Sequence, residues 1–210
     1  MRYRYIAIEG NIGAGKTSLS TRLANDLGAR LILEEFADNP FLPKFYEEPD
    51  RYAFPLELSF LAERFSQLKR DLDQPDLFGG HIVSDYFLSK SLIFSRNNLQ
   101  GDEYQLFSRM FHLIIQQIPR PDILVYLYLD IPRLRENIVK RGRPYEQSIS
   151  PSYLESVQAN YFDFIRKQED QRVLIIDTNN LDFVNREEDY ERIKELIDKA
   201  YDKGVHQIVP

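Results

Sequence analysis

Residues 10–17 read "GNIGAGKT", between the apolar stretch "YIAIE" (5–9) and the sequence "SLSTRLANDLG" (18–28). The spacing of Gly10, Gly15, Lys16 and Thr17 matches the pattern G-x-x-x-x-G-K-[ST]. Glycines in such a loop let successive backbone N–H groups converge on an anion, and the following helix adds the positive end of its dipole. We therefore predict a strand, a phosphate-binding loop and a helix in this order.

The loop predicts a nucleotide site with ATP and Mg²⁺. Lys16 is expected to reach the β- and γ-phosphates, and the Thr17 hydroxyl is expected to ligate Mg²⁺. The alternative is a glycine-rich turn with an exposed lysine, but the position between a strand and a helix favours phosphate binding. The residues expected to bind the nucleotide are Gly10, Asn11, Ile12, Gly13, Ala14, Gly15, Lys16, Thr17 and Ser18.

Short apolar runs alternate with helical patterns along the chain. Strands are expected within residues 3–9, 29–34, 81–85, 122–130 and 172–177, and helices near 16–27, 42–48, 53–73, 87–97, 103–118, 132–141, 151–169 and 188–203. This alternation is typical of βαβ units, and the continuous apolar runs indicate strands covered on both faces. We predict an α/β fold with a parallel sheet in one domain, residues 1–210. Residues 71–81 are expected to form a loop. The sequence indicates no clear role for the tail "HQIVP" (206–210).

Composition narrows the function. The chain has 27 basic and 33 acidic residues among 210, a net charge of -6, which argues against coating nucleic acid with positive charge. The absence of cysteine excludes disulfides and thiolate catalysis, and three histidines argue against a histidine metal cluster. The apolar run "ILVYLYL" (123–129) is far shorter than the roughly 20 residues of a membrane helix. We expect a soluble, cytoplasmic protein that binds neither nucleic acid nor membranes.

Acidic residues end four of the expected strands: Glu34, Asp85, Asp130 and Asp177. Ligands of open α/β sheets bind at the carboxyl ends of the strands. Glu34 lies beside the phosphate loop if the second strand neighbours the first. Asp85 and Asp130 are rival candidates for a Mg²⁺ ligand, and Asp177 is a weaker third. Each could instead cap a helix or face water.

Basic residues cluster in "RLRENIVKRGRPYEQ" (133–147). Gly142 and Pro144 indicate the end of a helix, where the macrodipole favours cations. The functional alternative is a lid over about residues 137–147, whose cations close over the triphosphate, neutralise the transferred phosphoryl group and exclude water. Because an acidic protein needs a local device to bind a polyanion, we favour the lid.

Five segments together resemble the deoxynucleoside kinases, most closely the bacterial branch that phosphorylates purine deoxynucleosides. They are "IEGNIGAGKT" (8–17), "EEFADNPFLPKFY" (34–46), "YAFPLELSFLAERFSQLK" (52–69), "VSDYFLSKSLIFS" (83–95) and "KRGRPYEQ" (140–147). The resemblance implies a five-stranded parallel sheet in the order of P-loop kinases, flanked by helices. It also implies a homodimer that uses ATP as phosphate donor.

The resemblance assigns roles to single residues. Glu34 matches the general base that takes the proton from the nucleoside 5′-hydroxyl, and Asp85, in place of Asp130, matches the acidic residue of the Mg²⁺ site. The other matches are the lid arginines Arg141 and Arg143, Tyr46 and Glu146 at the deoxyribose 3′-hydroxyl, Phe94 stacked on the base, and Glu57 and Arg64 at the base edge.

Glu57 and Arg64 bear on which base is read. They lie just under two helical turns apart, so both project from one helix face. An ionised glutamate only accepts hydrogen bonds, which suits the N1–H and 2-amino donors of guanine and not the N1 acceptor of adenine. Arg64 could donate to guanine O6 or N7, or hold Glu57. The alternative is a solvent-facing charge pattern on an amphipathic helix.

Three positions depart from the family's pattern. Tyr86 stands where most of the family has an arginine that steadies the general base, so either Tyr86 bonds Glu34 or another cation takes that task. Lys90 contacts the purine or faces solvent. Asn137 occupies a lid position where an arginine would be expected, which leaves open whether Arg135 substitutes for it.

The expected reaction converts deoxyguanosine and ATP to dGMP and ADP. A deoxyadenosine kinase or a broad deoxynucleoside kinase is the nearest alternative. A nucleoside monophosphate kinase of the thymidylate type would need an arginine for its acceptor phosphate, whereas Glu34 and Glu57 favour a neutral acceptor. A slowly hydrolysing nucleotide switch would share the loop, but the chain shows no further interaction domain to support it.

Overall fold

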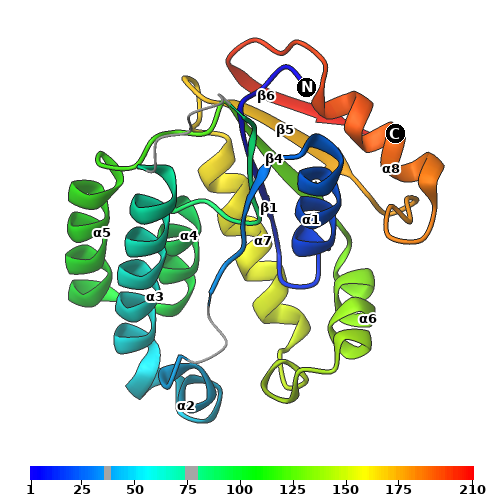
Figure 1. The fold of residues 1–210 in the computed structure, drawn as a ribbon. Coiled ribbons are helices and arrows are strands. Elements are labelled where there is room, and N and C mark those ends of the chain that lie inside the picture. The colour runs from blue at the N-terminus through cyan, green and yellow to red at the C-terminus, as the bar shows by residue number, and fades with distance from the viewer. Residues whose placement is uncertain (36–38, 74–79) are drawn as a thin grey trace.

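The computed structural model describes residues 1–35, 39–73 and 80–210. A parallel sheet with helices on both faces confirms the predicted α/β fold class (Figure 1). Of the loop expected at 71–81, residues 74–79 lie outside the described residues. The sheet has the order β2-β3-β1-β4-β5-β6. Its strands are β1 (Tyr5–Gly10), β2 (Arg30–Ile32), β3 (Ile82–Ser84), β4 (Ile123–Tyr128), β5 (Arg172–Asp177) and β6 (Gly204–Ile208).

Most helices lie within a few residues of their expected positions. They are α1 (Lys16–Leu27), α2 (Phe41–Glu47), α3 (Pro49–Leu72), α4 (Ser89–Asn98), α5 (Gly101–Ile115), α6 (Ile131–Arg141), α7 (Pro151–Ile165) and α8 (Glu187–Ile197), with a short 3₁₀ helix, η1 (Pro144–Glu146). Gly142 ends α6 in the left-handed conformation, as its sequence context predicts. None of the helices in the described ranges combines the length and apolarity that a membrane crossing needs.

The sixth strand corrects two expectations, that the sheet has five strands and that the C-terminal tail has no role. β6 pairs in parallel with β5 at the edge of the sheet, with Val205 opposite Val173. The helix expected at 188–203 ends at Ile197, and the chain then runs into β6. Residues of β6 alternate between partly buried and exposed. Because it is exposed along one side, this edge strand lacks the continuous apolar run that marks the central strands.

The two faces of the sheet have separate cores. Ile6 and Ile8 of β1 pack on the face that α1 and α8 cover, whereas Tyr5 and Ala7 pack on the face of α3, α4 and α7. Figure 1 shows these two groups of helices on opposite sides of the strands. Burial of alternate residues on opposite faces explains why the central strands are apolar at consecutive positions.

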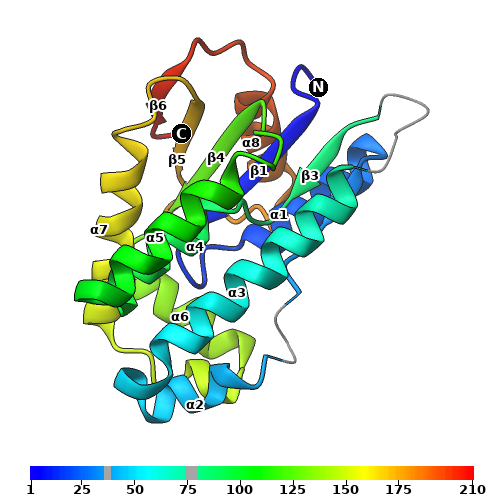
Figure 2. The same ribbon diagram turned by 90° about the vertical axis from the view of Figure 1, so that its left-hand side faces the viewer.

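The carboxyl edge of the sheet gathers the segments expected to bind ligands. β1 lies between β3 and β4, so the phosphate loop after β1 and Asp85 after β3 meet at one edge. α2 and η1 lie together beyond this edge (Figure 2). There the ring of Tyr46 stacks on that of Tyr145, with centroids 6.1 Å apart.

A buried carboxylate fixes the end of β1 beneath the phosphate loop. Glu9 is 1% exposed, and burial raises the pKa of its side chain. One carboxylate oxygen accepts from the Phe87 backbone N–H at 2.8 Å, and the other accepts from the Tyr161 hydroxyl at 2.9 Å. These bonds join β1 to the segment after β3 and to α7, so the loop rises from a fixed base.

The Tyr161 hydroxyl is expected to stabilise the fold by satisfying Glu9. Tyr161→Phe leaves a buried carboxyl oxygen unpaired and should lower the free energy of unfolding by about 1–3 kcal/mol. Tyr126 is the matched control, because its hydroxyl is buried beside the Tyr161 ring and has no hydrogen-bond partner among the described residues. In urea unfolding, Tyr126→Phe should be neutral or stabilising. Equal losses in both variants would contradict the role of the Tyr161–Glu9 bond.

Candidate functional site

The loop over residues 10–17 requires glycine at two of its positions. Gly13 and Gly15 adopt φ values of 85° and 87°, which side chains rarely adopt. A Cβ on Gly13 would lie 2.6 Å from the Leu134 carbonyl oxygen, and one on Gly15 would lie 2.7 Å from the Phe183 ring. Both backbone conformation and packing therefore require glycine at these two positions.

Lys16 folds back over the loop. Its Nζ donates to the Asn11 carbonyl oxygen at 2.9 Å, while the buried Asn11 side chain donates to the Leu154 carbonyl oxygen at 2.8 Å. Desolvation, followed by the nearby ammonium of Lys90, lowers the pKa of Lys16 to about 8. An anion bound in the loop would favour the charged form of Lys16 again, so this site is suited to phosphate.

Thr17 and Asp85 form an oxygen pair beside the loop. The Thr17 hydroxyl donates to Asp85 Oδ2 at 2.6 Å, and Asp85 Oδ1 accepts from the Glu34 backbone N–H at 2.8 Å. The described residues include no group of three or more His, Asp or Glu side chains that could hold a metal on their own. Mg²⁺ often takes only one or two protein ligands, together with water and substrate phosphates. The hydroxyl and carboxylate fit this second type of site.

The other strand-end acids lie in local turns. Asp130 Oδ1 accepts from the Tyr128 hydroxyl at 2.8 Å. Asp177 accepts from the backbone and the side chain of Asn179. Of the candidates for the metal role, Asp85 is the one bonded to the phosphate loop.

Glu34 is buried in a cluster of charges. Its Oε1 accepts from Arg64 Nε at 2.8 Å and lies 2.7 Å from Arg64 Nη2, while its Oε2 lies 2.5 Å from Lys90 Nζ. Arg64 also donates to Ser91 Oγ at 2.8 Å. Burial acts to raise the pKa of Glu34, but the two cations outweigh it and lower the pKa from 4.5 to about 2.

The lowered pKa makes the charge cluster a source of stability at neutral pH. Because the folded pKa of Glu34 lies below the unfolded one, the contribution is complete above the unfolded pKa. It is lost as the pH falls from about 4.5 toward about 2. Glu34 is therefore a carboxylate throughout the physiological range.

A pocket between α2, α3, α4, η1 and α7 joins the predicted substrate residues except Asp85, which lies beside the phosphate loop. Its lining includes Glu34, Tyr46, Glu57, Arg64, Phe94 and Glu146. Glu57 Oε1 accepts from Asn98 Nδ2 at 2.6 Å. Sequence reasoning missed Asn98 as a pocket residue. Its spacing could have revealed it, because Lys90, Phe94 and Asn98 recur every fourth residue and all line the pocket.

The cationic segment borders the phosphate loop. A groove is lined by loop residues 13–18 and by the cations Arg133, Lys140, Arg141 and Arg143. Asn137 donates to the Gly13 carbonyl oxygen at 2.8 Å, so α6 packs directly on the loop.

Glu146 links the groove to the pocket. This carboxylate is 6% exposed and accepts from Arg141 at 2.5 Å and from Arg143 at 3.2 Å. Because Glu146 also lines the pocket, the two arginines of the groove are tied to the pocket wall.

The comparison with known proteins agrees with this geometry. The model of the deoxynucleoside kinase family matches residues 6–202. The chain belongs to the deoxynucleoside kinase family. The kinase is 37% identical over 201 residues to a deoxyguanosine kinase of Bacillus subtilis, covering 92% of this chain and 97% of the relative. It is 32% identical to a deoxyadenosine/deoxycytidine kinase of the same organism, covering 91% and 90%.

A solved structure supports the same assignment for the fold. The kinase superimposes on a deoxyadenosine kinase from M. mycoides with bound dATP, with a TM-score of 0.80 and 25% identity. The alignment covers 93% of this chain and all of the other.

Tyr86 and Lys90, two positions that depart from the family's pattern, are related in the structure. The Tyr86 hydroxyl donates to Gln67 Oε1 at 2.6 Å, and Gln67 donates in turn to the Leu33 carbonyl oxygen. Lys90 is 8% exposed and forms an ion pair with Glu34. It therefore does not face solvent, and it holds Glu34 in place of Tyr86. The structure thus agrees with the alternative in which another cation holds Glu34, one helical turn beyond Tyr86.

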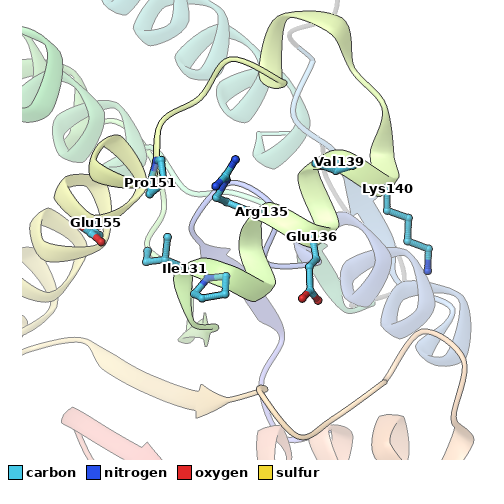
Figure 3. Close-up of a pocket in the computed structure, with 8 residues that line it drawn as sticks. Ile131, Arg135, Glu136, Val139, Lys140, Pro151 and Glu155 are labelled. Atoms are coloured by element: carbon cyan, nitrogen blue, oxygen red, sulfur yellow. The ribbon is translucent and has the colours of Figure 1, made fainter.

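Arg135 lies apart from the phosphate loop. It lines a hollow between α6 and the start of α7, together with Val139, Pro151 and Glu155 (Figure 3). Arg133, two residues earlier in the kinase, lines the groove of the loop. Of these two arginines, Arg133 is therefore the one that borders the phosphate loop.

Lys90, and not Tyr86, is expected to set the ionisation of Glu34. Lys90→Met should raise the pKa of the Glu34 carboxyl by about 1–3 pH units, because one of its two cations is removed. Tyr86→Phe, the control, should leave that pKa unchanged. The onset of Glu34 protonation, followed by ¹³C NMR of the side-chain carboxyl, measures both. A rise in Tyr86→Phe with none in Lys90→Met would contradict this assignment.

Proposed function

We propose that the chain transfers the γ-phosphoryl group of ATP to the 5′-hydroxyl of a purine deoxynucleoside, with deoxyguanosine as the preferred acceptor. The observation that carries this proposal is the ionised Glu34 between the phosphate loop and a pocket lined by two further acids, Glu57 and Glu146. A phosphorylated acceptor would be repelled there, whereas a neutral nucleoside can use these carboxylates as hydrogen-bond acceptors.

The donor side holds and neutralises the triphosphate. The backbone of residues 13–17 would surround the β-phosphate, and Lys16 would reach the γ-phosphate. Mg²⁺ would be held by Thr17 and Asp85 and would neutralise charge between the β- and γ-phosphates. Arg141 and Arg143 border the same groove and would stabilise the charge of the transferred group.

The acceptor side orients the attacking oxygen. The carboxylate of Glu34 would accept a hydrogen bond from the 5′-hydroxyl and direct its oxygen toward the γ-phosphorus. Phosphoryl transfer has a loose transition state, in which the hydroxyl becomes acidic as its oxygen bonds to phosphorus. Glu34 therefore takes the proton late, which suits a carboxylate of low pKa. Lys90 and Arg64 hold it in position during this step.

The remaining contacts select the sugar and the base. Tyr46 and Glu146 would bond the 3′-hydroxyl, and Phe94 would stack on the base. Glu57 would accept from N1–H and the 2-amino group of guanine. The similarity to a deoxyguanosine kinase at 37% identity supports this choice of base.

We also propose that the protein acts as a cytoplasmic homodimer, as its resemblance to the family implies. Leu106 and Leu113 support a self-association surface. They are 42% and 72% exposed and lie two turns apart on one face of α5.

Initial rates with a panel of acceptors test the proposal. With ATP and Mg²⁺ at about pH 8, kcat/KM should be highest for deoxyguanosine, by at least about tenfold over deoxyadenosine, because the misfit leaves a buried polar group unpaired. Deoxycytidine, thymidine and dTMP should be poorer still. A higher kcat/KM for dTMP than for every nucleoside would overturn the nucleoside kinase assignment. Preference for deoxyadenosine would overturn the choice of base alone.

A further inference from the structure

Glu57 has one satisfied and one unsatisfied oxygen. Its side chain is 1% exposed, and Oε1 accepts from Asn98 Nδ2 at 2.6 Å. Oε2 is buried and has no hydrogen-bond partner among the described residues. A buried carboxylate oxygen without a partner is unfavourable, and a donor on a ligand or a bound proton would relieve this cost.

The charges nearest to Glu57 are already paired. Arg64 on α3 and Lys90 on α4 both form ion pairs with Glu34, which follows β2. None of the ion pairs among the described residues involves Glu57 itself. The cations attract the Glu57 carboxylate at a distance, and Glu34 opposes them.

The other titratable groups of the pocket do not supply a countercharge. Tyr153 on α7 and Tyr46 on α2 are partly buried, and desolvation raises the pKa of both hydroxyls, which stay neutral. Glu146 in η1 is paired with Arg141 and Arg143. Glu57 is therefore the acid of the pocket that lacks a cation of its own within the described part of the chain.

Burial is the main influence on the ionisation of Glu57. Desolvation outweighs the attraction of Arg64 and the hydrogen bond from Asn98, and it raises the pKa of Glu57 to about 7. The carboxylate and the carboxylic acid are thus both populated near neutral pH. Because Oε1 already accepts from Asn98, a proton on Glu57 resides on Oε2 and makes that oxygen a donor into the pocket.

We propose that Glu57 reads purines in two protonation states, so that pH sets the choice between guanine and adenine. This inference rests on the function proposed above. The carboxylate accepts from N1–H and the 2-amino group of guanine. The carboxylic acid donates from Oε2 to N1 of adenine and accepts from the 6-amino group, as a glutamine amide would. Each purine therefore requires the form of Glu57 that the other rejects.

Proton linkage gives this mechanism a distinctive pH profile. The kcat/KM for deoxyguanosine follows the ionised fraction of Glu57, and that for deoxyadenosine follows the protonated fraction. Their ratio should rise about tenfold for each pH unit. Effects of pH on Glu34, Lys16, ATP and the lid are common to both reactions and cancel in the ratio.

A competition experiment measures the ratio directly. Deoxyguanosine and deoxyadenosine are supplied together with ATP and Mg²⁺, and dGMP and dAMP are separated and quantified at about pH 6, 7 and 8. The product ratio should rise about a hundredfold over this range. Glu57→Gln keeps the size of the side chain but does not titrate, so its ratio should be independent of pH and shifted toward dAMP. A flat ratio in the wild-type protein, or the same slope in Glu57→Gln, would overturn the proposal.

Proton exchange on binding gives a readout independent of turnover. In calorimetric titrations of the wild-type protein near neutral pH, in buffers of different ionisation enthalpy, deoxyguanosine should release protons and deoxyadenosine should take them up. Equal proton exchange for the two nucleosides would overturn the inference. A protein that phosphorylates neither nucleoside would instead overturn the proposed function, so the two failures are distinguishable.

Discussion

The buried ion pairs of Glu34 with Arg64 and Lys90 connect the elements of the site. A carboxylate as buried as Glu34 would be very costly without counter-charges, and two cations from different helices satisfy both of its oxygens. Arg64 comes from α3 and Lys90 from α4, while the backbone of Glu34 is held by Asp85 after β3. The charge cluster thus fixes two helices relative to the sheet edge and keeps the Glu34 carboxylate ionised in the pocket beside the phosphate loop.

A second carboxylate, that of Glu146, connects the groove and the pocket. Glu146 pairs with Arg141 and Arg143 and also lines the pocket. In the proposed reaction the arginines neutralise the transferred phosphoryl group, while Glu146 contacts the sugar. A contact between Glu146 and the 3′-hydroxyl would therefore be linked to both arginines through these two ion pairs. Both carboxylates act through position and charge, which are the main contributions a protein makes to phosphoryl transfer.

Much of this arrangement could be predicted from the sequence. The glycine pattern at residues 10–17 and the apolar runs predicted the loop and the strands β1–β5. The strand-end acids included Glu34 and Asp85, and the resemblance to the family chose Asp85 over Asp130. β6 was not predicted because its residues alternate between partly buried and exposed and form no continuous apolar run. The ion pair of Lys90 with Glu34 was not predicted, because lysine is usually exposed. The burial of Lys90 depends on this carboxylate, which lies 56 residues away in the chain. The contact of Asn98 with Glu57 likewise depends on how α3 and α4 pack, although its spacing from Phe94 placed both on one helix face.

The central claim is that the Glu34 carboxylate accepts the hydroxyl proton and that the cations around it serve this role. The most direct measurement is the single-turnover rate of phosphoryl transfer to deoxyguanosine in Glu34→Gln, together with the dissociation constant of the nucleoside. We predict a rate lower by about 10²–10⁴-fold, with nucleoside binding largely retained. Retained binding also verifies that the variant is folded despite its two unpaired cations. A near-normal transfer rate in Glu34→Gln would contradict the claim.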